Sequence, residues 1–259
     1  MTALQDNQLK VVIPARYGSR RLPGKPLLDL CGEPMIVHVV KRATSALSGA
    51  DVWVATDDER IKVEVERHGY RALMTSTRHE SGLDRTAEVA RELNWSKQDI
   101  VINVQGDEPL IEPELIRRFA HFCSSRESFE VGSVMSPMES AAGIFDSNVV
   151  KVIINQCGEA ISFSRAPLPF CRDAHPSDYP YKVYRRHIGL YAYSVSALLH
   201  LAETPPCDLE ILEKLEQLRA LWLGYRIAML SWPDLVMGGV DVESDINRVR
   251  EILEHGRSL

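Results

Sequence analysis

Short apolar runs alternate with segments of helical periodicity through the first half of the chain, and this alternation constrains the fold more than any other feature. The apolar runs, each of strand length, lie at residues 9–13, 51–56, 70–75 and 99–105. The helical patterns between them lie at residues 34–47, 58–69 and 84–94. Strands that alternate with helices in this way form a mostly parallel sheet with helices on both faces. The sequence therefore predicts an α/β fold.

The second half of the chain is less regular and predicts a smaller lobe. Further strands are expected at residues 130–137, 149–155, 187–194 and 226–230. An amphipathic helix is predicted at 208–225, followed by a closing helix at 244–256; the apolar face of the first carries Leu212, Leu215, Leu218, Leu221 and Trp222. Residues 164–186 are too rich in proline for a central strand. We expect one domain over residues 1–259, with a smaller lobe at about 160–205.

Composition narrows the class of protein. The formal net charge of −6 argues against a nucleic-acid-binding protein, because such proteins usually carry a basic surplus. The five cysteines are scattered without a CxxC pair, which is typical of reduced thiols and not of a disulfide framework or a zinc site. The N-terminal residues lack a signal-peptide pattern, and no apolar run approaches the ~18 residues of a membrane span. These features predict a cytoplasmic protein that does not insert into membranes.

The stretch "IPARYGSRRLPGKPL", residues 13–27, follows the first strand and is rich in glycine and cations. Five residues separate Gly18 from Gly24, and Lys25 is followed by proline, so the spacing and the hydroxyl of a P-loop are missing. The dinucleotide fingerprint GxGxxG is also absent. Arg16 and Lys25 can neutralise phosphate charge at the carboxyl end of a strand, where open α/β sheets bind ligands. The stretch is therefore either a polyphosphate cradle or a solvated surface loop.

The order of the residues in this stretch resembles the sugar nucleotidylyltransferases, and most closely the CMP-Kdo synthetase (3-deoxy-manno-octulosonate cytidylyltransferase) family. The resemblance continues along nearly the whole chain in family order, through "WVATDDERI" (53–61), "HESGLDR" (79–85), "VINVQGDEPLI" (101–111), "FSRAPLPF" (163–170), "YRRHIGLYAY" (184–193), "LEKLEQLRAL" (212–221) and "GVDVESDINRVR" (239–250). It implies a Rossmann-like nucleotide-diphospho-sugar transferase sheet.

This resemblance also implies a reaction. CMP is transferred from CTP to 3-deoxy-D-manno-octulosonate (Kdo), when the sugar 2-hydroxyl attacks the α-phosphate and pyrophosphate leaves. The reaction is assisted by Mg²⁺ and feeds lipopolysaccharide biosynthesis, and the protein is expected to be a homodimer. Alternatives that stay open are a variant sugar acid such as 8-amino-Kdo or sialic acid, another cytidylyltransferase, and a non-catalytic nucleotide-binding relative.

The resemblance assigns roles to individual residues of this chain. Asp107 and Asp241 are expected to hold Mg²⁺ and, with Arg16 and Lys25, to be catalytic, since Mg²⁺ binds through one or two carboxylates plus substrate phosphates. The expected nucleotide-binding residues are Arg16, Ser19, Lys25, Ser81 and Arg85. The expected sugar-binding residues are Gln105, Arg165, His187, Tyr191, Glu216 and Gln217.

Several of these residues also have plainer interpretations. Arg85 can form a helix-surface ion pair with Asp84 or Glu88, and His187 can be a half-buried structural histidine. Glu216 and Gln217 can belong to the polar face of the predicted helix. Lys151 can either reach a phosphate or lie on a strand face.

The chain departs from the family pattern at three positions. Leu83 replaces a small hydroxyl residue, which places one base or sugar contact in question. Arg20 adds a cation after Ser19. Val242 replaces a threonine that caps the last helix, a change of about 1 kcal/mol in stability.

Overall fold

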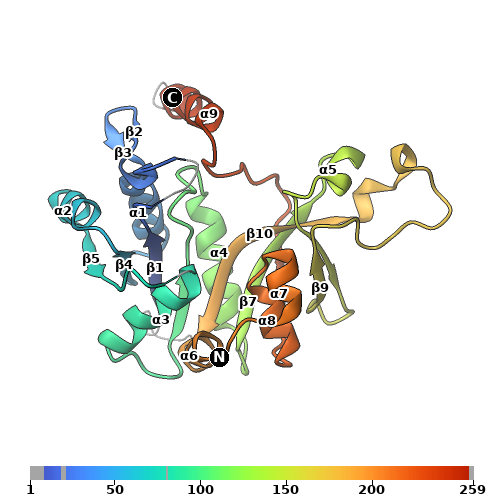
Figure 1. Cartoon of the computed structure of the whole chain (residues 1–259), viewed down its shortest axis with the longest axis horizontal. Coiled ribbons are helices and arrows are strands. Elements are labelled where there is room, and N and C mark those ends of the chain that lie inside the picture. The colour runs from blue at the N-terminus through green and yellow to red at the C-terminus, as the bar shows by residue number, and fades with distance from the viewer. Residues whose placement is uncertain (1–8, 19–21, 80, 257–259) are drawn as a thin grey trace.

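The computed structural model describes residues 9–18, 22–79 and 81–256, and its centre is a nine-stranded sheet. The main strand order is β11-β7-β10-β6-β1-β4-β5, and β8 and β9 extend from β10 (Figure 1). Helices cover the sheet, and α9 (Glu243–Gly256) lies beside a small hairpin of β2 (Asp29–Leu30) and β3 (Glu33–Pro34). The predicted α/β fold is confirmed.

The half of the sheet built from the first half of the chain is parallel. It contains β1 (Leu9–Ala15), β4 (Asp51–Thr56), β5 (Arg71–Met74) and β6 (Ile100–Asn103). The helices that connect these strands, and the one that follows β6, are α1 (Met35–Ala46), α2 (Glu59–Arg67), α3 (Gly82–Glu92) and α4 (Pro113–Ser124). The predicted strands and the first three helices are confirmed, whereas α4 was not predicted.

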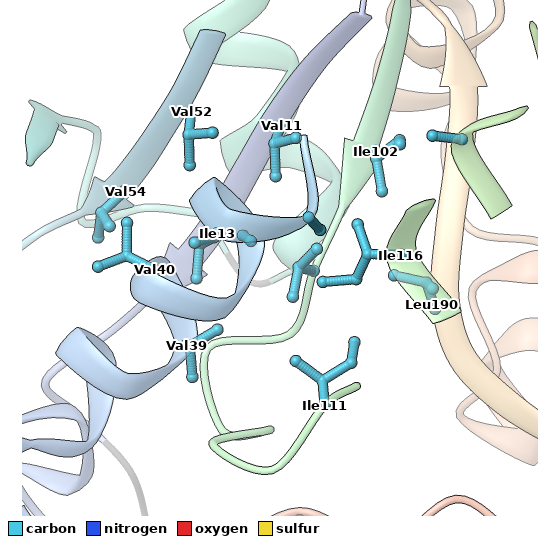
Figure 2. Packing of buried hydrophobic residues seen from close by; sticks show 14 of the residues in the cluster. Val11, Ile13, Val39, Val40, Val52, Val54, Ile102, Ile111, Ile116 and Leu190 are labelled. Carbon is cyan, nitrogen blue, oxygen red and sulfur yellow. The ribbon is translucent and has the colours of Figure 1, made fainter. Parts of the chain in front are cut away.

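Alternate residues of the central strands supply two cores, because successive side chains of a strand point to opposite faces. On one face, Val11 and Ile13 of β1 pack with Val39 and Val40 of α1 (Figure 2). On the other face, Val12 packs into a second cluster that includes Leu83 and Ala87 of α3. Both faces of β1 are therefore buried, which explains its nearly continuous apolar sequence.

The other half of the sheet is mixed. Strand β10 (Arg185–Ser194) runs antiparallel between β6 and β7 (Val131–Pro137), and β11 (Ile227–Ser231) runs parallel to β7. Strands β8 (Lys151–Ile154) and β9 (Ala160–Ser164) pair antiparallel with each other. Two helices of this half were not predicted, α5 (Ala141–Phe145) and α6 (Val195–Glu203).

The prediction of one continuous helix at 208–225 is wrong. The segment forms two short helices, α7 (Asp208–Glu213) and α8 (Gln217–Trp222), separated by Lys214 in a left-handed conformation. The break lets Arg219 form a two-bond ion pair with Glu210, with N–O distances of 2.6 and 2.7 Å. In one helix these residues would lie about 13.5 Å apart along the axis. The buried pair therefore favours the break, and it leaves Leu212 of the predicted apolar face 80% exposed.

The proline-rich segment extends away from the sheet at the β8–β9 side (Figure 1). It contains two 3-10 helices, η3 (Pro176–Asp178) and η4 (Tyr181–Val183), and a further short 3-10 helix, η2 (Lys25–Leu27), follows β1. Tyr179 and Tyr184 of the segment form a small core of their own with Met138 and Ile144. No helix of the described ranges is long and apolar enough to cross a membrane.

Candidate active site

A cleft of about 580 Å³ opens at the carboxyl ends of β1 and β6. Many of the residues that were predicted from the sequence to bind nucleotide, metal or sugar line it together: Arg16, Lys25, Ser81, Arg85, Gln105, Asp107, Glu216 and Asp241. Ligands of open α/β sheets bind at this edge, where the loops that follow neighbouring parallel strands converge. Ser19 and Arg20 lie outside the described residues.

Lys25 is the centre of the charged groups in this cleft. Its ammonium nitrogen lies 2.6 Å from Oδ2 of Asp107 and 3.4 Å from Oδ1 of Asp241. The lysine side chain is only 11% exposed, whereas the two carboxylates are open to solvent on one side, at 38% and 56%. The loops after β1, after β6 and before α9 thus bring one cation and two anions to a single point.

Two glycines allow the carboxylate loops to approach one another. A Cβ atom at Gly239 would lie 2.6 Å from the carbonyl oxygen of Asp107, which also accepts a 2.9 Å hydrogen bond from Val240 N–H. A Cβ atom at Gly106 would lie 2.6 Å from the carbonyl oxygen of Pro14. Only glycine fits at such backbone contacts, so the spacing of the loops depends on these positions.

The turn before α9 is stabilised by the carboxylate of Asp245, a residue of the first turn of that helix. Oδ2 of Asp245 accepts hydrogen bonds from the backbone N–H groups of Asp241 at 2.8 Å and Val242 at 3.0 Å. Arg248 donates to the carbonyl oxygens of Gly238 and Gly239 at 3.0 and 3.2 Å. Asp245 thus satisfies the N–H groups of the turn before the helix, whereas the Val242 side chain offers no acceptor to the N–H groups of the first turn of α9.

The chemistry of the two carboxylates suits a magnesium ion. Asp107 and Asp241 present hard oxygen ligands close enough to share one cation, as their common contact with Lys25 shows. No cluster of three or more His, Cys, Asp or Glu side chains able to hold a metal occurs in the described part of the chain. Two carboxylates alone hold Mg²⁺ weakly, and substrate phosphates usually complete its coordination.

Glu108 and Glu216 are carboxyl groups whose surroundings oppose their ionisation. Burial, with a contribution from the charge of Asp107, raises the pKa of Glu108 to about 8. Burial, with contributions from Asp84 and Glu210, raises the pKa of Glu216 to about 7, although Arg219 and a hydrogen bond from Leu83 N–H lower it. Carboxyl groups with pKa values shifted in this way are common at functional sites.

Replacing Glu216 by glutamine is expected to stabilise the fold at alkaline pH. The folded-state pKa, about 7, lies above the usual 4.5, so the native state binds the proton more tightly and stability falls as pH rises through this window. The free energy of unfolding should rise by no more than about 1 kcal/mol at about pH 5 and by about 3 kcal/mol at about pH 8. Urea unfolding at both pH values measures this, with exposed Glu203→Gln as the control. An equal effect at both pH values would contradict it.

Arg85 is buried and is not part of a helix-surface ion pair, so that interpretation is wrong. Its side chain is 4% exposed, and its guanidinium donates to Oδ2 of Asp57 at 2.9 Å. The two acids considered as its partners have other contacts: Asp84 accepts from Ser81, and Glu88 pairs with His79. The arginine is therefore held at the wall of the cleft by an acid that follows a neighbouring strand.

Two features of the segment 79–85 differ from what its sequence indicated. The side chain of Leu83 lies in the core with Ala87 and does not line the cleft, so it adds no bulk there. His79 lines the cleft and was missed, although its place beside Ser81 in the motif "HESGLDR" was a usable signal.

The remaining predicted sugar-binding residues lie outside the cleft lining. Arg165 donates to the carbonyl oxygens of Glu213 and Ser147 at 2.7 and 2.8 Å. The ring of His187 packs against Tyr191 at 5.4 Å between centroids, and its Nε2 lies 2.8 Å from Ser133 Oγ.

Electrostatics keep both rings uncharged. Burial, and secondarily the charge of Arg186, lowers the pKa of His187 to about 3. Burial raises the pKa of Tyr191 well above its usual range. The amide nitrogen of Gln217 is buried and has no hydrogen-bond partner among the described residues.

Lys151 is a structural residue, and the phosphate-binding alternative for it is wrong. Its side chain is fully buried, and Nζ donates to the carbonyl oxygens of Asp146, Val149 and Arg165 at 2.9, 2.6 and 2.5 Å. Burial also lowers the pKa of its ammonium group. The lysine therefore ties the loop before β8 to the end of β9.

The sheet, the cation-rich loop and the paired carboxylates define a nucleotide-binding protein of the nucleotidyltransferase class. More particularly, the chain belongs to the cytidylyltransferase family, whose model matches residues 10–227. It is 50% identical to the 3-deoxy-manno-octulosonate cytidylyltransferase 2 of Paraburkholderia phytofirmans, over 95% of this chain and 94% of that protein. It is 45% identical to the 3-deoxy-manno-octulosonate cytidylyltransferase of Idiomarina loihiensis, over 95% and 98%.

A solved structure shares the same architecture. The CMP:2-keto-3-deoxy-manno-octonic acid synthetase complexed with CTP superposes with a TM-score of 0.88 at 38% sequence identity. The match covers 96% of this chain and 99% of that one. The similarity therefore extends over the sheet, the cleft and the smaller lobe together.

Proposed function

We propose that this protein is a 3-deoxy-manno-octulosonate cytidylyltransferase, which converts CTP and Kdo to CMP-Kdo and pyrophosphate for lipopolysaccharide biosynthesis. The observation that carries the proposal is the convergence of Lys25, Asp107 and Asp241 at the carboxyl edge of the sheet. Relatives with this activity in their names match nearly the full chain, which supports the same substrates here.

The transfer needs charge neutralisation and positioning more than covalent catalysis. Asp107 and Asp241 would hold Mg²⁺, which neutralises the triphosphate when it is bound. Arg16 and Lys25, with Ser19 from the same loop, would bind the phosphates, and Lys25 would offset the charge that develops as pyrophosphate leaves. Ser81 and Arg85 would bind the cytidine and phosphate end of CTP.

The sugar acid would lie toward α8 and β10. Glu216 and Gln105 line the cleft there and would accept or donate hydrogen bonds to hydroxyl groups. Arg165 has donors beyond its two carbonyl contacts and would pair with the sugar carboxylate. His187, Tyr191 and Gln217 would complete this side as neutral groups.

Pyrophosphate release tests the proposal. We expect release when the protein is given Mg²⁺, Kdo and CTP, and at least about 100-fold less with UTP, ATP or GTP, because rejecting a base that leaves buried polar groups unpaired is strongly selective. Sialic acid and 8-amino-Kdo replace Kdo in parallel reactions. Release that depends on one of those acids instead would overturn the choice of sugar, and no release with any nucleotide would overturn the proposed reaction.

The surroundings of the enzyme are part of the same proposal. We place it in the cytoplasm, which accords with its five free cysteines.

We also propose that it is a homodimer through the smaller lobe at about 160–205. Large apolar side chains are exposed on this lobe, including Phe170 at 74% and Val183 at 65%. Light scattering of the purified protein measures its mass and tests the dimer.

A further inference from the structure

Asp57 joins two parts of the cleft, although the proposed reaction gives it no role. It follows directly after β4, in the motif "WVATDDERI". Its Oδ2 accepts a 2.9 Å hydrogen bond from Nη2 of Arg85, and its Oδ1 accepts a 3.3 Å bond from the backbone N–H of Tyr17. The side chain is 17% exposed, so both contacts are largely shielded from water. One carboxylate thus bridges the wall of the cleft and the loop after β1.

On the Arg85 side, the guanidinium is held at both terminal nitrogens. Besides the bond to Asp57, Nη1 donates to the hydroxyl of Thr75 at 2.5 Å. That hydroxyl donates its own proton to the carbonyl oxygen of Thr56 at 3.0 Å, so its lone pairs face the arginine. Because the arginine is hydrogen-bonded to residues at the ends of two adjacent strands, it loses little further rotamer freedom when it binds a phosphate.

On the Tyr17 side, a second hydrogen bond connects the backbone of Tyr17 to the residue that precedes Lys25. The carbonyl oxygen of Tyr17 accepts a 3.1 Å hydrogen bond from Gly24 N–H, directly before Lys25. The tyrosine ring packs under Gly24, where an added Cβ would lie 3.1 Å from its hydroxyl, and Arg60 covers the ring at 3.6 Å from its centroid. Gly24 has a φ of +70°, which favours glycine. Tyr17 therefore links Asp57 to the residue directly before Lys25.

We infer that Asp57 is a positioning residue for CTP binding, which sets the separation between Arg85 and Lys25, an assignment that rests on the proposed function. The carboxylate is required because both of its oxygens accept at once. An asparagine of the same shape offers one acceptor and one N–H₂ group, and that group would face either Tyr17 N–H or the arginine. Asp57→Asn therefore breaks one of the two links and leaves the volume unchanged.

The first test compares Asp57→Asn with Asp51→Asn. Asp51 lies at the other end of β4 and has its own ion pairs with Lys10 and Arg71. Calorimetry with CTP and MgCl₂, without sugar acid, should show about tenfold or greater loss of affinity in Asp57→Asn, the size expected for one charge-assisted hydrogen bond. In turnover, KM for CTP should rise similarly, while KM for Kdo stays within about twofold. Asp51→Asn should match the wild type in each measurement.

A second set of variants separates positioning from a purely structural role. Thr75→Val removes the other contact of Arg85 and should also weaken CTP binding, without touching Tyr17. In an Arg85→Lys background, Asp57→Asn should reduce the affinity for CTP markedly less than it does in the wild type, because the two residues act together. Equal CTP affinity of Asp57→Asn and wild type, or a full additive cost in the Arg85→Lys background, would overturn the inference. If the wild type binds CTP but releases no pyrophosphate, the proposed reaction fails while the affinity comparison still decides the role of Asp57.

Discussion

Asp107→Asn is expected to lower the rate of pyrophosphate release at least about 1,000-fold, because it removes one of two carboxylates that converge at the site. Asparagine keeps the size of the side chain and can still accept a hydrogen bond from Lys25, so the backbone contact between Asp107 and Val240 should persist. The loss should therefore be in catalysis and in the dependence on Mg²⁺, with a higher Mg²⁺ concentration needed for half-maximal rate.

Asp99→Asn is the matched control for this experiment. Asp99 directly precedes β6, at the opposite end of this strand from Asp107, and accepts a 3.1 Å hydrogen bond from Ser96 N–H; it does not line the cleft. The rate of pyrophosphate release by Asp99→Asn should remain within about twofold of the wild type, since surface substitutions usually change stability by less than about 0.5 kcal/mol. A rate for Asp107→Asn within tenfold of the wild type, with unchanged Mg²⁺ dependence, would show that Asp107 does not hold the metal.

Local patterns predicted the parallel half of the sheet well. Strands such as β6 are apolar runs of strand length buried on both faces, and this signal depends on the segment alone. The break between α7 and α8 could not be predicted in the same way. It depends on Arg219 reaching Glu210 and the carbonyl oxygens of Leu201 and Thr204, which are contacts made only in the folded chain.

The site shows the same division between local and long-range information. The family resemblance identified Lys25, Asp107 and Asp241 as site residues, and the loop that carries Lys25 was placed at the carboxyl end of the first strand. That the lysine lies between the acids follows only from the folded loops. The partner of Arg85 was missed because Asp57 is 28 residues earlier in the chain, whereas the nearby acids offered plausible helix-surface pairs.

Lys25→Met is expected to lower the rate of pyrophosphate release about 100- to 1,000-fold, because a positioned charge at the departing phosphates is lost. It should also change how the protein responds to Mg²⁺ without nucleotide. In the wild type the ammonium group occupies the space between Asp107 and Asp241, so it competes with a divalent cation for the same oxygens. The variant removes this competitor.

Without Lys25 the two carboxylates repel one another, and the variant should lose about 1–2 kcal/mol of stability in EDTA, less than for a fully buried pair because both acids are partly exposed. Mg²⁺ should restore this loss, and it should raise the melting temperature of Lys25→Met more than that of the wild type. Lys41→Met, which breaks an exposed pair with Glu33, is the control and should respond to Mg²⁺ as the wild type does. Equal stabilisation of Lys25→Met and wild type by Mg²⁺ would mean that the aspartates do not form a cation site, whereas a larger response would locate that site at the position that Lys25 occupies between them.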